Sequence, residues 1–253
     1  MGVYIPGPDL RLPGLRLVSA AAGPFANHPT LATGLVSYWA LDEASGTRYD
    51  SVVASGNDLT DNNTVGSVAG KLNNAASFVA ANSESLSLAG GLTALSDNFT
   101  VDFWVAAAVV TREGLLTNGN GIGLVPLGFT VEDNVFGAGD LLIITRNDGG
   151  TYCYTSTGVI TTDGSAFQHV VITYATAASP AVHVYINGVD KALTFAGAPS
   201  VLGAGNLFSL GRRGDTPRFF TGRQDEVGLW SRVLTAQERT DLWAADAGLF
   251  YGS

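Results

Sequence analysis

A pair of carboxylate side chains could hydrolyse a glycosidic bond. Cutting a glycosidic bond requires two carboxyl groups about 5–10 Å apart, which on one strand means acidic residues two positions apart. Asp225 and Glu226 are adjacent, so we expect them to point to opposite faces of their strand. No glutamate belongs to a Glu-x-Asp or Glu-x-x-x-Glu set in a predicted strand, and the glutamates are Glu43, Glu84, Glu113, Glu132, Glu226 and Glu238. The sequence therefore predicts a non-enzymatic protein, unless carboxylates converge from distant strands.

Aromatic rings near asparagines could bind a sugar, because lectins stack ring faces on pyranoses and add hydrogen bonds from Asn or Asp. Tyr152, Tyr154 and Phe219 could supply such faces, and Asn118 or Asn120 the polar groups. The tryptophans in predicted strands, Trp39, Trp104 and Trp230, are more often core residues than sugar-stacking surfaces.

Arginines gather in one part of this acidic chain, and they are Arg212, Arg213, Arg218, Arg223 and Arg232. Their forked guanidinium groups suit carboxylates on a partner surface or an anionic glycan. We therefore add Arg212, Arg213 and Asp215 to the candidate glycan- or partner-binding residues. The alternative is a solvated loop whose arginines pair with neighbouring acidic side chains.

The overall charge excludes one broad class of partner. A formal net charge of −9 argues against general nucleic-acid binding, which requires a basic face. The sequence has no run of 18 apolar residues, so we expect no membrane span. The N-terminus lacks the basic and apolar regions of a secretory signal peptide. Cys153 is the single cysteine, so no internal disulfide can form, and we expect a packed thiol rather than a nucleophile.

Short apolar strands separated by turns rich in Gly, Asn and Asp make up most of the chain. Residues 99–105 alternate between apolar and polar side chains, and residues 169–174 form an apolar run. Asn187-Gly188 is the dipeptide best suited to a type I′ turn and predicts a hairpin. This pattern predicts an all-β antiparallel sandwich or jelly roll.

One short helix is expected near the C-terminus. Thr235 and Glu238 are three residues apart, the spacing of a capping box in which each side chain bonds a free backbone N–H of the first turn. A helix at this position would cover a β-structure rather than begin a βαβ unit.

Residues 1–33 differ from the rest and form a predicted extended, Pro-rich arm before a domain at 34–253. Prolines at positions 6, 8, 13 and 24 prevent long regular elements. The arm is also too apolar for a typical disordered tail. We expect it to lie against another subunit, although it could instead fold onto its own domain. The apolar residues proposed for assembly are Tyr4, Ile5, Leu10, Leu12, Leu15, Leu17 and Phe25.

About residues 35–245 resemble the LamG-like jelly rolls of the concanavalin A-like lectin/glucanase superfamily. Each matching segment is weak by itself, but their number and order are those of the family. The segments are 35–47, 50–59, 99–105, 167–174, 184–188 and 222–235. The last residues, 242–251, resemble the tails of such domains in bacteriophage structural proteins.

The resemblance implies a calcium ion near the start of the domain, because LamG-like relatives often hold one there. It points to Asp50 and Asp225 as ligands, with Asn57 or Asp58 as supplements, since calcium prefers several oxygen ligands. The alternative is that the loop residues form turns through hydrogen bonds from their side chains to the backbone.

These features together predict a non-enzymatic bacteriophage virion protein, such as a capsid decoration protein. Its arm would anchor the jelly roll to other virion subunits, in a homo-oligomer that could bind glycans. The alternatives are a free-standing carbohydrate-binding adhesion module and, third, a divergent glycoside hydrolase.

Overall fold

The computed structural model describes residue 25 and the ranges 27–52, 54–92, 97–119, 128–146, 152–178, 180–197, 207–214 and 218–249, together with residues 95 and 251. The predicted arm residues Tyr4, Ile5, Leu10, Leu12, Leu15 and Leu17 lie outside the described residues, as do Asn120 and Asp215. Within the described ranges, no helix has both the length and the apolar character needed to cross a bilayer.

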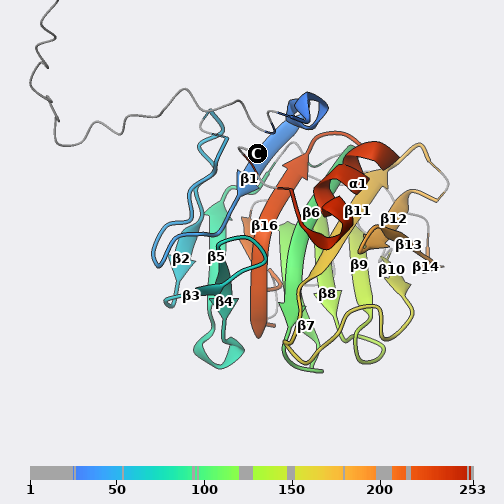
Figure 1. The fold of residues 1–253 in the computed structure, drawn as a ribbon. Coiled ribbons are helices and arrows are strands. Elements are labelled where there is room, and N and C mark those ends of the chain that lie inside the picture. Colours follow the sequence, from blue (N-terminus) through green and yellow to red (C-terminus); the bar gives the residue numbers. More distant parts are fainter. Residues whose placement is uncertain are drawn as a thin grey trace, which may run out of the picture.

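Two antiparallel sheets form a sandwich, which confirms the predicted architecture (Figure 1). In the described residues the first sheet has eight strands: β1 (Leu35–Trp39), β3 (Gly66–Ala69), β4 (Asn74–Phe78), β6 (Asn98–Ala107), β11 (Gln168–Ala175), β12 (Val182–Ile186), β13 (Val189–Lys191) and β16 (Gly222–Trp230). Their order is β13-β12-β11-β6-β16-β4-β3, and β1 pairs with β16.

The second sheet also has eight strands in the described part of the chain: β2 (Thr60–Asn62), β5 (Ser85–Ala89), β7 (Glu113–Gly119), β8 (Gly128–Asp133), β9 (Leu141–Arg146), β10 (Tyr152–Thr155), β14 (Leu193–Ala196) and β15 (Leu207–Leu210). Their order is β14-β10-β9-β8-β7-β15-β5-β2. Neighbours in both sheets are often far apart in sequence, as expected for a jelly roll.

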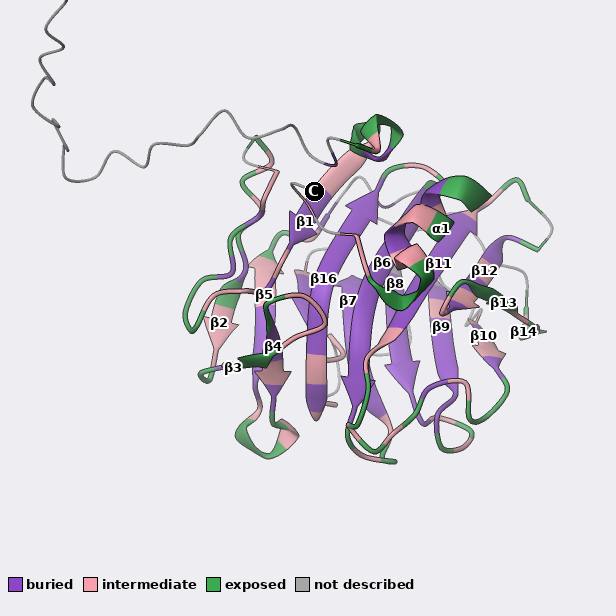
Figure 2. Ribbon diagram, in the orientation of Figure 1, coloured by how far each residue is buried: buried purple, intermediate pink, exposed green. Residues whose placement is uncertain are grey.

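The main core lies between the sheets because their strands alternate inward apolar and outward side chains. Figure 2 shows the buried residues running along the central strands. Trp39 of β1 stacks on Phe208 of β15 with ring centroids 5.0 Å apart, and Phe99 of β6 meets Phe129 of β8 edge-on at 5.0 Å. Each such buried ring contributes about 1.5–3 kcal/mol through removal from water.

The expected hairpin and helix are both present. Ile186 pairs with Val189 across Asn187-Gly188, whose φ angles of 50° and 75° are those of a type I′ turn. Helix α1 (Ala236–Trp243) begins with the predicted capping box between Thr235 and Glu238. The remaining helices of the described residues are single 3₁₀ turns: η1 (Pro29–Ala32), η2 (Ala80–Asn82) and η3 (Ala244–Asp246).

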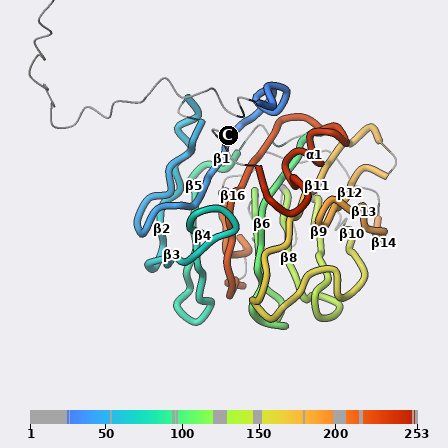
Figure 3. The backbone as a smooth tube through the Cα atoms, in the orientation of Figure 1, coloured from blue at the N-terminus to red at the C-terminus, as the bar shows by residue number. Residues whose placement is uncertain are grey.

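A second, smaller core covers the outer face of the first sheet, where the segment before β1 and the segment around α1 meet (Figure 3). Its fully buried members are Phe25, Leu31, Tyr38, Trp230, Leu234 and Leu242. Phe25 was expected to contact another subunit. The structure instead places its ring among this chain's own Tyr38, Trp230 and Tyr251.

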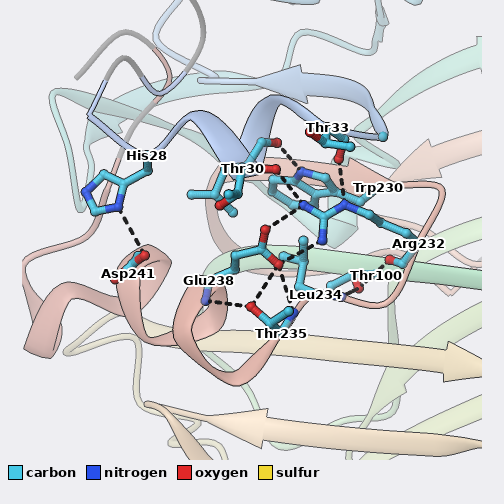
Figure 4. A network of polar contacts seen from close by, with 12 residues as sticks. His28, Thr30, Thr33, Thr100, Trp230, Arg232, Leu234, Thr235, Glu238 and Asp241 are labelled. Atoms are coloured by element: carbon cyan, nitrogen blue, oxygen red, sulfur yellow. Dashed lines mark hydrogen bonds and ion pairs between the residues drawn. The ribbon is translucent and has the colours of Figure 1, made fainter.

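Arg232 fastens the segment before β1 to the capped helix (Figure 4). Its guanidinium donates from Nε to Thr33 O at 2.6 Å and from Nη2 to Thr30 O at 2.7 Å. The same group forms a two-armed ion pair with Glu238, at 2.8 and 2.7 Å. His28 lies 3.1 Å from the Asp241 carboxylate beside it. Residues 28–33 are therefore part of the folded domain rather than of a separate arm.

Candidate functional site

The outer face of the second sheet presents two rows of side chains across β8, β9 and β10. One row consists of Glu132, Leu142 and Tyr154, and the next contains Ile144 and Tyr152. The alternate residues of the same strands enter the main core. Strand pairing therefore collects charged, apolar and aromatic groups on one surface.

A hollow of about 280 Å³ lies on this surface. Its lining combines aromatic, aliphatic and cationic side chains, and consists of Arg112, Val135, Phe136, Leu142, Ile144, Tyr152 and Arg213. A mostly apolar lining with a few polar groups at defined positions is typical of small-ligand sites.

One wall of the hollow is an aromatic cluster, in which Phe136 and Tyr152 line the hollow and Tyr154 packs against Phe136. The rings of Phe136 and Tyr154 have centroids 4.2 Å apart, Phe136 and Tyr152 are 6.2 Å apart, and the two tyrosines are 6.3 Å apart. Phe136 is 53 % exposed, although it is a large apolar side chain. An exposed aromatic group of this kind is a surface on which a flat or ring-shaped ligand can stack.

Phe136 is held by the turn that joins β8 to β9. The Asp140 carboxylate accepts hydrogen bonds from the backbone N–H groups of Val135, Phe136 and Gly137, at 2.8, 2.6 and 3.0 Å. Asn134 adopts a left-handed φ of 53° and donates from its side-chain amide to the carbonyl oxygens of the 109–111 segment. The ring is therefore positioned before any ligand arrives, which lowers the entropy cost of binding.

A buried carboxylate orients the two arginines of the hollow. Glu132 is fully buried, and its Oε2 lies 2.6 Å from Arg112 Nε while its Oε1 lies 3.2 Å from Arg213 Nη1. The side chains of Arg112 and Arg213 are 30 % and 16 % exposed. Both guanidinium groups lie against the same carboxylate.

Gly114 allows the loop that carries Arg213 to lie against β7. A Cβ at this position would lie 2.1 Å from the backbone nitrogen of Arg213. The Gly114 N–H donates to Arg218 O at 3.2 Å, and the Arg213 N–H donates to the same oxygen at 3.1 Å. The loop after β15 is therefore in direct backbone contact with the strand beside the hollow.

The predicted sugar- or partner-binding residues are partly brought together here. Tyr152 and Arg213 line the hollow, and Tyr154 contacts Phe136 at its wall. Arg212 lies behind the rim, with its guanidinium 5.9 Å from the Phe219 ring centroid and hydrogen bonds to the oxygens of Arg213 and Gly214.

Asn118 lies elsewhere, inside the sandwich. It is 1 % exposed, and its side chain exchanges hydrogen bonds with the backbone N–H and C=O of Leu92 at 2.8 and 3.0 Å. Its role in the structure is to hold the segment after β5 against β7.

Most of the lining was not predicted, namely Arg112, Val135, Phe136, Leu142 and Ile144, and neither was Glu132, which contacts the two arginines. Glu132 carried no distinctive signal, because its strand also contains the polar residues Thr130 and Asp133. Phe136 lies in a turn bounded by Asn134 and Asp140, whose side chains favour turns. Nothing in the spacing of Arg112 indicated that it reaches Glu132.

The predicted calcium ligands lie in two places. Asp50 accepts the N–H groups of Tyr38 and Val52 at 3.0 and 2.8 Å, and Asp58 accepts the Asp50 N–H at 2.8 Å. Asn57 donates to Ser37 Oγ at 2.7 Å. Two of these bonds, from the N–H groups of Asp50 and Val52, are the side-chain-to-backbone bonds of the alternative, whereas Asn57 bonds a side chain of β1.

Asp225 lies on β16, where its Oδ2 accepts the N–H groups of Lys71 and Leu72. Among the described residues, no three His, Cys, Asp or Glu side chains are grouped so that they could share a metal ion. The residues present therefore do not show a shared metal cage, and calcium binding stays a prediction.

The sequence predicted that Asp225 and Glu226 point to opposite faces of their strand, and this prediction is wrong. Glu226 has a φ of 48° at a bulge where the pairing of β16 with β6 shifts register. The extra residue turns Glu226 to the outer face, where it accepts a hydrogen bond from the Tyr38 hydroxyl. Both carboxylates are buried, at 0 % and 1 % exposure, so a substrate does not reach them.

Burial raises the pKa of both carboxyls, and their mutual repulsion adds to it for Glu226. The pKa of Asp225 rises to about 7 and that of Glu226 to about 9. Glu113 of β7 and Asp133 of β8 form a second buried pair, directly opposite each other. Burial also raises the pKa of Glu113 to about 7 and that of Asp133 well above its usual range. These groups lie in the interior and are not arranged to act on a ligand.

A larger groove of about 430 Å³ lies along the strands β12 to β14, at the edge of the sandwich. One aromatic ring, that of Phe195, lines it, and its His183 and Asp190 lie 3.4 Å apart and pair with each other. The smaller hollow brings together more aromatic surface and a fixed cationic pair, so it is the better candidate for a binding site.

Residues 73–238 match the sequence model of the concanavalin A-like lectin/glucanases superfamily, which is most of the chain. The chain belongs to this superfamily. No match is found among curated proteins.

Solved structures share the fold at low sequence identity. The binding domain of Paraclostridial Mosquitocidal Protein 1 is 15 % identical with a TM-score of 0.64, over 84 % of this chain and 52 % of that one. Domain 4 of AbnA, a GH43 extracellular arabinanase from Geobacillus stearothermophilus, was solved with arabinotriose. It is 21 % identical with a TM-score of 0.56, over 82 % of this chain and 97 % of that one.

Trypanosoma rangeli sialidase is 15 % identical with a TM-score of 0.57, over 83 % of this chain and 32 % of the enzyme. The chain thus spans about half the length of the mosquitocidal binding domain that it matches and a third of the sialidase. At these identities the likenesses concern the fold alone.

Proposed function

We propose that this superfamily member is a non-enzymatic carbohydrate-binding domain that holds a saccharide in the hollow on the second sheet. The observation that carries the proposal is the wall formed by Phe136, Tyr152 and Tyr154 beside the arginine rim. Sugar rings expose C–H faces that stack on aromatic groups, while their hydroxyls hydrogen-bond to polar side chains at the edge. Arabinotriose in the structure of AbnA domain 4 shows that a domain of this fold can hold a saccharide.

Hydrolysis is not supported by the carboxylates around this hollow. None of the described residues that line it is acidic, and the nearby Glu132 has both of its oxygens against arginines. A glycosidase requires two carboxyl groups on either side of the bond that it cuts. Binding without turnover is therefore the function that this geometry favours.

The test is a glycan array with the whole chain, followed by calorimetric titration of any saccharide that binds. Phe136→Ala and Tyr152→Ala each remove part of the wall and should weaken binding by at least about tenfold, which corresponds to about 1.4 kcal/mol. Tyr49→Ala is the matched control, because Tyr49 is a 62 % exposed aromatic residue outside the hollow. This variant should bind the saccharide as tightly as the parent protein does. Binding that survives both wall substitutions, or no binding to any glycan, would refute the proposal.

The predicted role in a bacteriophage virion is kept as a second proposal. It is supported by the hydrogen bonds from Arg232 to Thr30 and Thr33, which hold residues 28–33 on the domain. A partner that binds the preceding residues would therefore be attached to the folded domain. Removing residues 1–24 keeps Phe25 and these contacts. Sedimentation velocity should then show that the full chain forms an oligomer and the shortened chain a monomer. Equal masses for both chains would contradict a homo-oligomeric arm.

Calcium binding by Asp50, Asn57, Asp58 and Asp225 also remains a proposal. If calcium binds only the native state, it stabilises that state. Added calcium should therefore raise the melting temperature, and a chelator should lower it. Asp50→Asn should abolish this calcium dependence. Identical melting curves with calcium and with chelator would exclude the site.

A further inference from the structure

The charged residues that line the hollow are opposite in sign to the net charge of the whole protein. The chain has a formal net charge of −9, yet the two charged residues among those that line the hollow, Arg112 and Arg213, are both cationic. A cationic surface kept within an acidic chain attracts and orients anionic ligands.

Arg112 offers an oriented fork of donors to such a ligand. Its Nε is used by Glu132 at 2.6 Å, and this contact sets the plane of the guanidinium. In the described structure neither of its two terminal nitrogens has a hydrogen-bond partner, and 30 % of the side chain is exposed. Two parallel N–H groups match the oxygens of a carboxylate or a sulfate, and a pre-oriented guanidinium loses less entropy when it binds them.

The charge and the aromatic wall face the same space. Arg112 and Arg213 line the hollow together with Phe136 and Tyr152. A ligand that fills it must therefore combine a ring that can stack with an anionic group that reaches the rim. A neutral sugar would satisfy the wall but give the terminal nitrogens of Arg112 no anionic partner.

We infer that the hollow selects an anionic saccharide, one that bears a carboxylate or a sulfate, and places the anionic group against Arg112. This inference rests on the proposed carbohydrate-binding function and names its ligand class. Arg112 is the residue that determines specificity, whereas the aromatic wall supplies affinity that neutral sugars would share.

The test compares acidic oligosaccharides with neutral ones of the same length, by calorimetric titration of the whole chain. An oligogalacturonate is paired with a neutral galactan oligosaccharide, and a sulfated chondroitin oligosaccharide is paired with its desulfated form. The acidic member should bind at least about tenfold more tightly at low salt, and this advantage should shrink as salt rises. Comparing the two pairs separates a carboxylate from a sulfate as the recognised group.

Arg112→Gln should weaken binding of the acidic oligosaccharide by at least about tenfold. It should leave the weaker binding of the neutral oligosaccharide unchanged. Arg112→Lys keeps the charge without the fork and should give an intermediate loss. Lys191→Gln is the matched control, since it removes the same charge at the edge groove and should not alter affinity. Unfolding curves of each variant confirm that the domain is intact.

The outcomes separate this inference from the function on which it rests. Equal affinity for acidic and neutral members, with wall substitutions still weakening both, would overturn the anionic specificity and leave carbohydrate binding standing. No binding to any saccharide would overturn both. Preference for the acidic members that Arg112→Gln abolishes would support both.

Discussion

The hydroxyl of Tyr38 donates a hydrogen bond to the buried carboxylate of Glu226, joining β1 to the bulge of β16. The two residues are almost at opposite ends of the domain sequence, and Asp102 and Asp225 lie near enough to repel the same carboxylate. Asp102 is itself bonded to His169 Nε2 at 2.6 Å. A group of ionisable side chains is thus enclosed between the first sheet and its cover.

This arrangement predicts that stability falls as pH rises. Burial raises the pKa of Glu226 from 4.5 to about 9, and that of Asp225 to about 7, so the native state holds protons that the unfolded chain releases. The contribution is fully present below about pH 4.5 and is lost as pH rises through these values, at about 1.4 kcal/mol per unit of pKa shift. The melting temperature should be higher near pH 5 than at pH 9.

Substitution identifies the group responsible for this dependence. Glu226→Gln keeps a hydrogen-bond partner for Tyr38 without a charge and should flatten the fall between pH 5 and 9. Asp190→Asn changes a 53 % exposed carboxylate and should leave the slope as it is. A parent protein that melts at the same temperature across this range would contradict a protonated Glu226.

Glu238 should contribute to stability with the opposite pH dependence. Its bonds to Arg232 lower its pKa to about 2, so its contribution to stability is present above pH 4.5 and is lost as pH falls through 2.

Glu238→Gln weakens the ion pair and the capping box together and should lower the free energy of unfolding by about 1–3 kcal/mol in denaturant at pH 7. Gln237→Ala, in the same helix turn but exposed, should change stability by less than about 0.5 kcal/mol. Equal effects of the two substitutions would show that Glu238 has no special role.

Gly114→Ala should displace the loop that carries Arg213 into the hollow. The added Cβ meets the Arg213 backbone at 2.1 Å, so the loop must move and take the Arg213 guanidinium with it. We expect a loss of about 1–3 kcal/mol in stability, as for other overpacked sites, and weaker binding of an acidic saccharide. Gly66→Ala is the control: its Cβ would make ordinary contact at 3.5 Å and should leave binding unchanged. Retained affinity in Gly114→Ala would mean that the position of Arg213 does not matter.

Cys153 should be inert in the folded protein. It is 1 % exposed, and burial raises the pKa of its thiol to about 12, which suppresses the reactive thiolate. A disulfide reagent that releases a coloured thiol should therefore react with Cys153 only after denaturant is added. The rate of that reaction should equal the rate of global unfolding. Rapid reaction in native buffer would show that β10 opens locally.

The sandwich and its local elements could be predicted from sequence because their signals are local. Alternation in residues 99–105 sets which side of β6 enters the core, and Asn187-Gly188 suits the left-handed angles of its turn. Thr235 and Glu238 form the capping box because three residues span the first turn of a helix. Each of these outcomes depends on neighbours within a few positions.

The hollow and the buried carboxylates were decided by the tertiary structure. Tyr152 and Arg213 were predicted as separate candidates, but strand order alone brings them beside Phe136 and onto the Arg112–Glu132 pair. A single bulge reversed the predicted direction of Glu226, since one extra residue moves every later side chain to the other face. Outside this bulge, sequence periodicity determined which residues face a sheet surface. Long-range strand pairing determined which of those residues meet, because such contacts join segments with no fixed spacing along the chain.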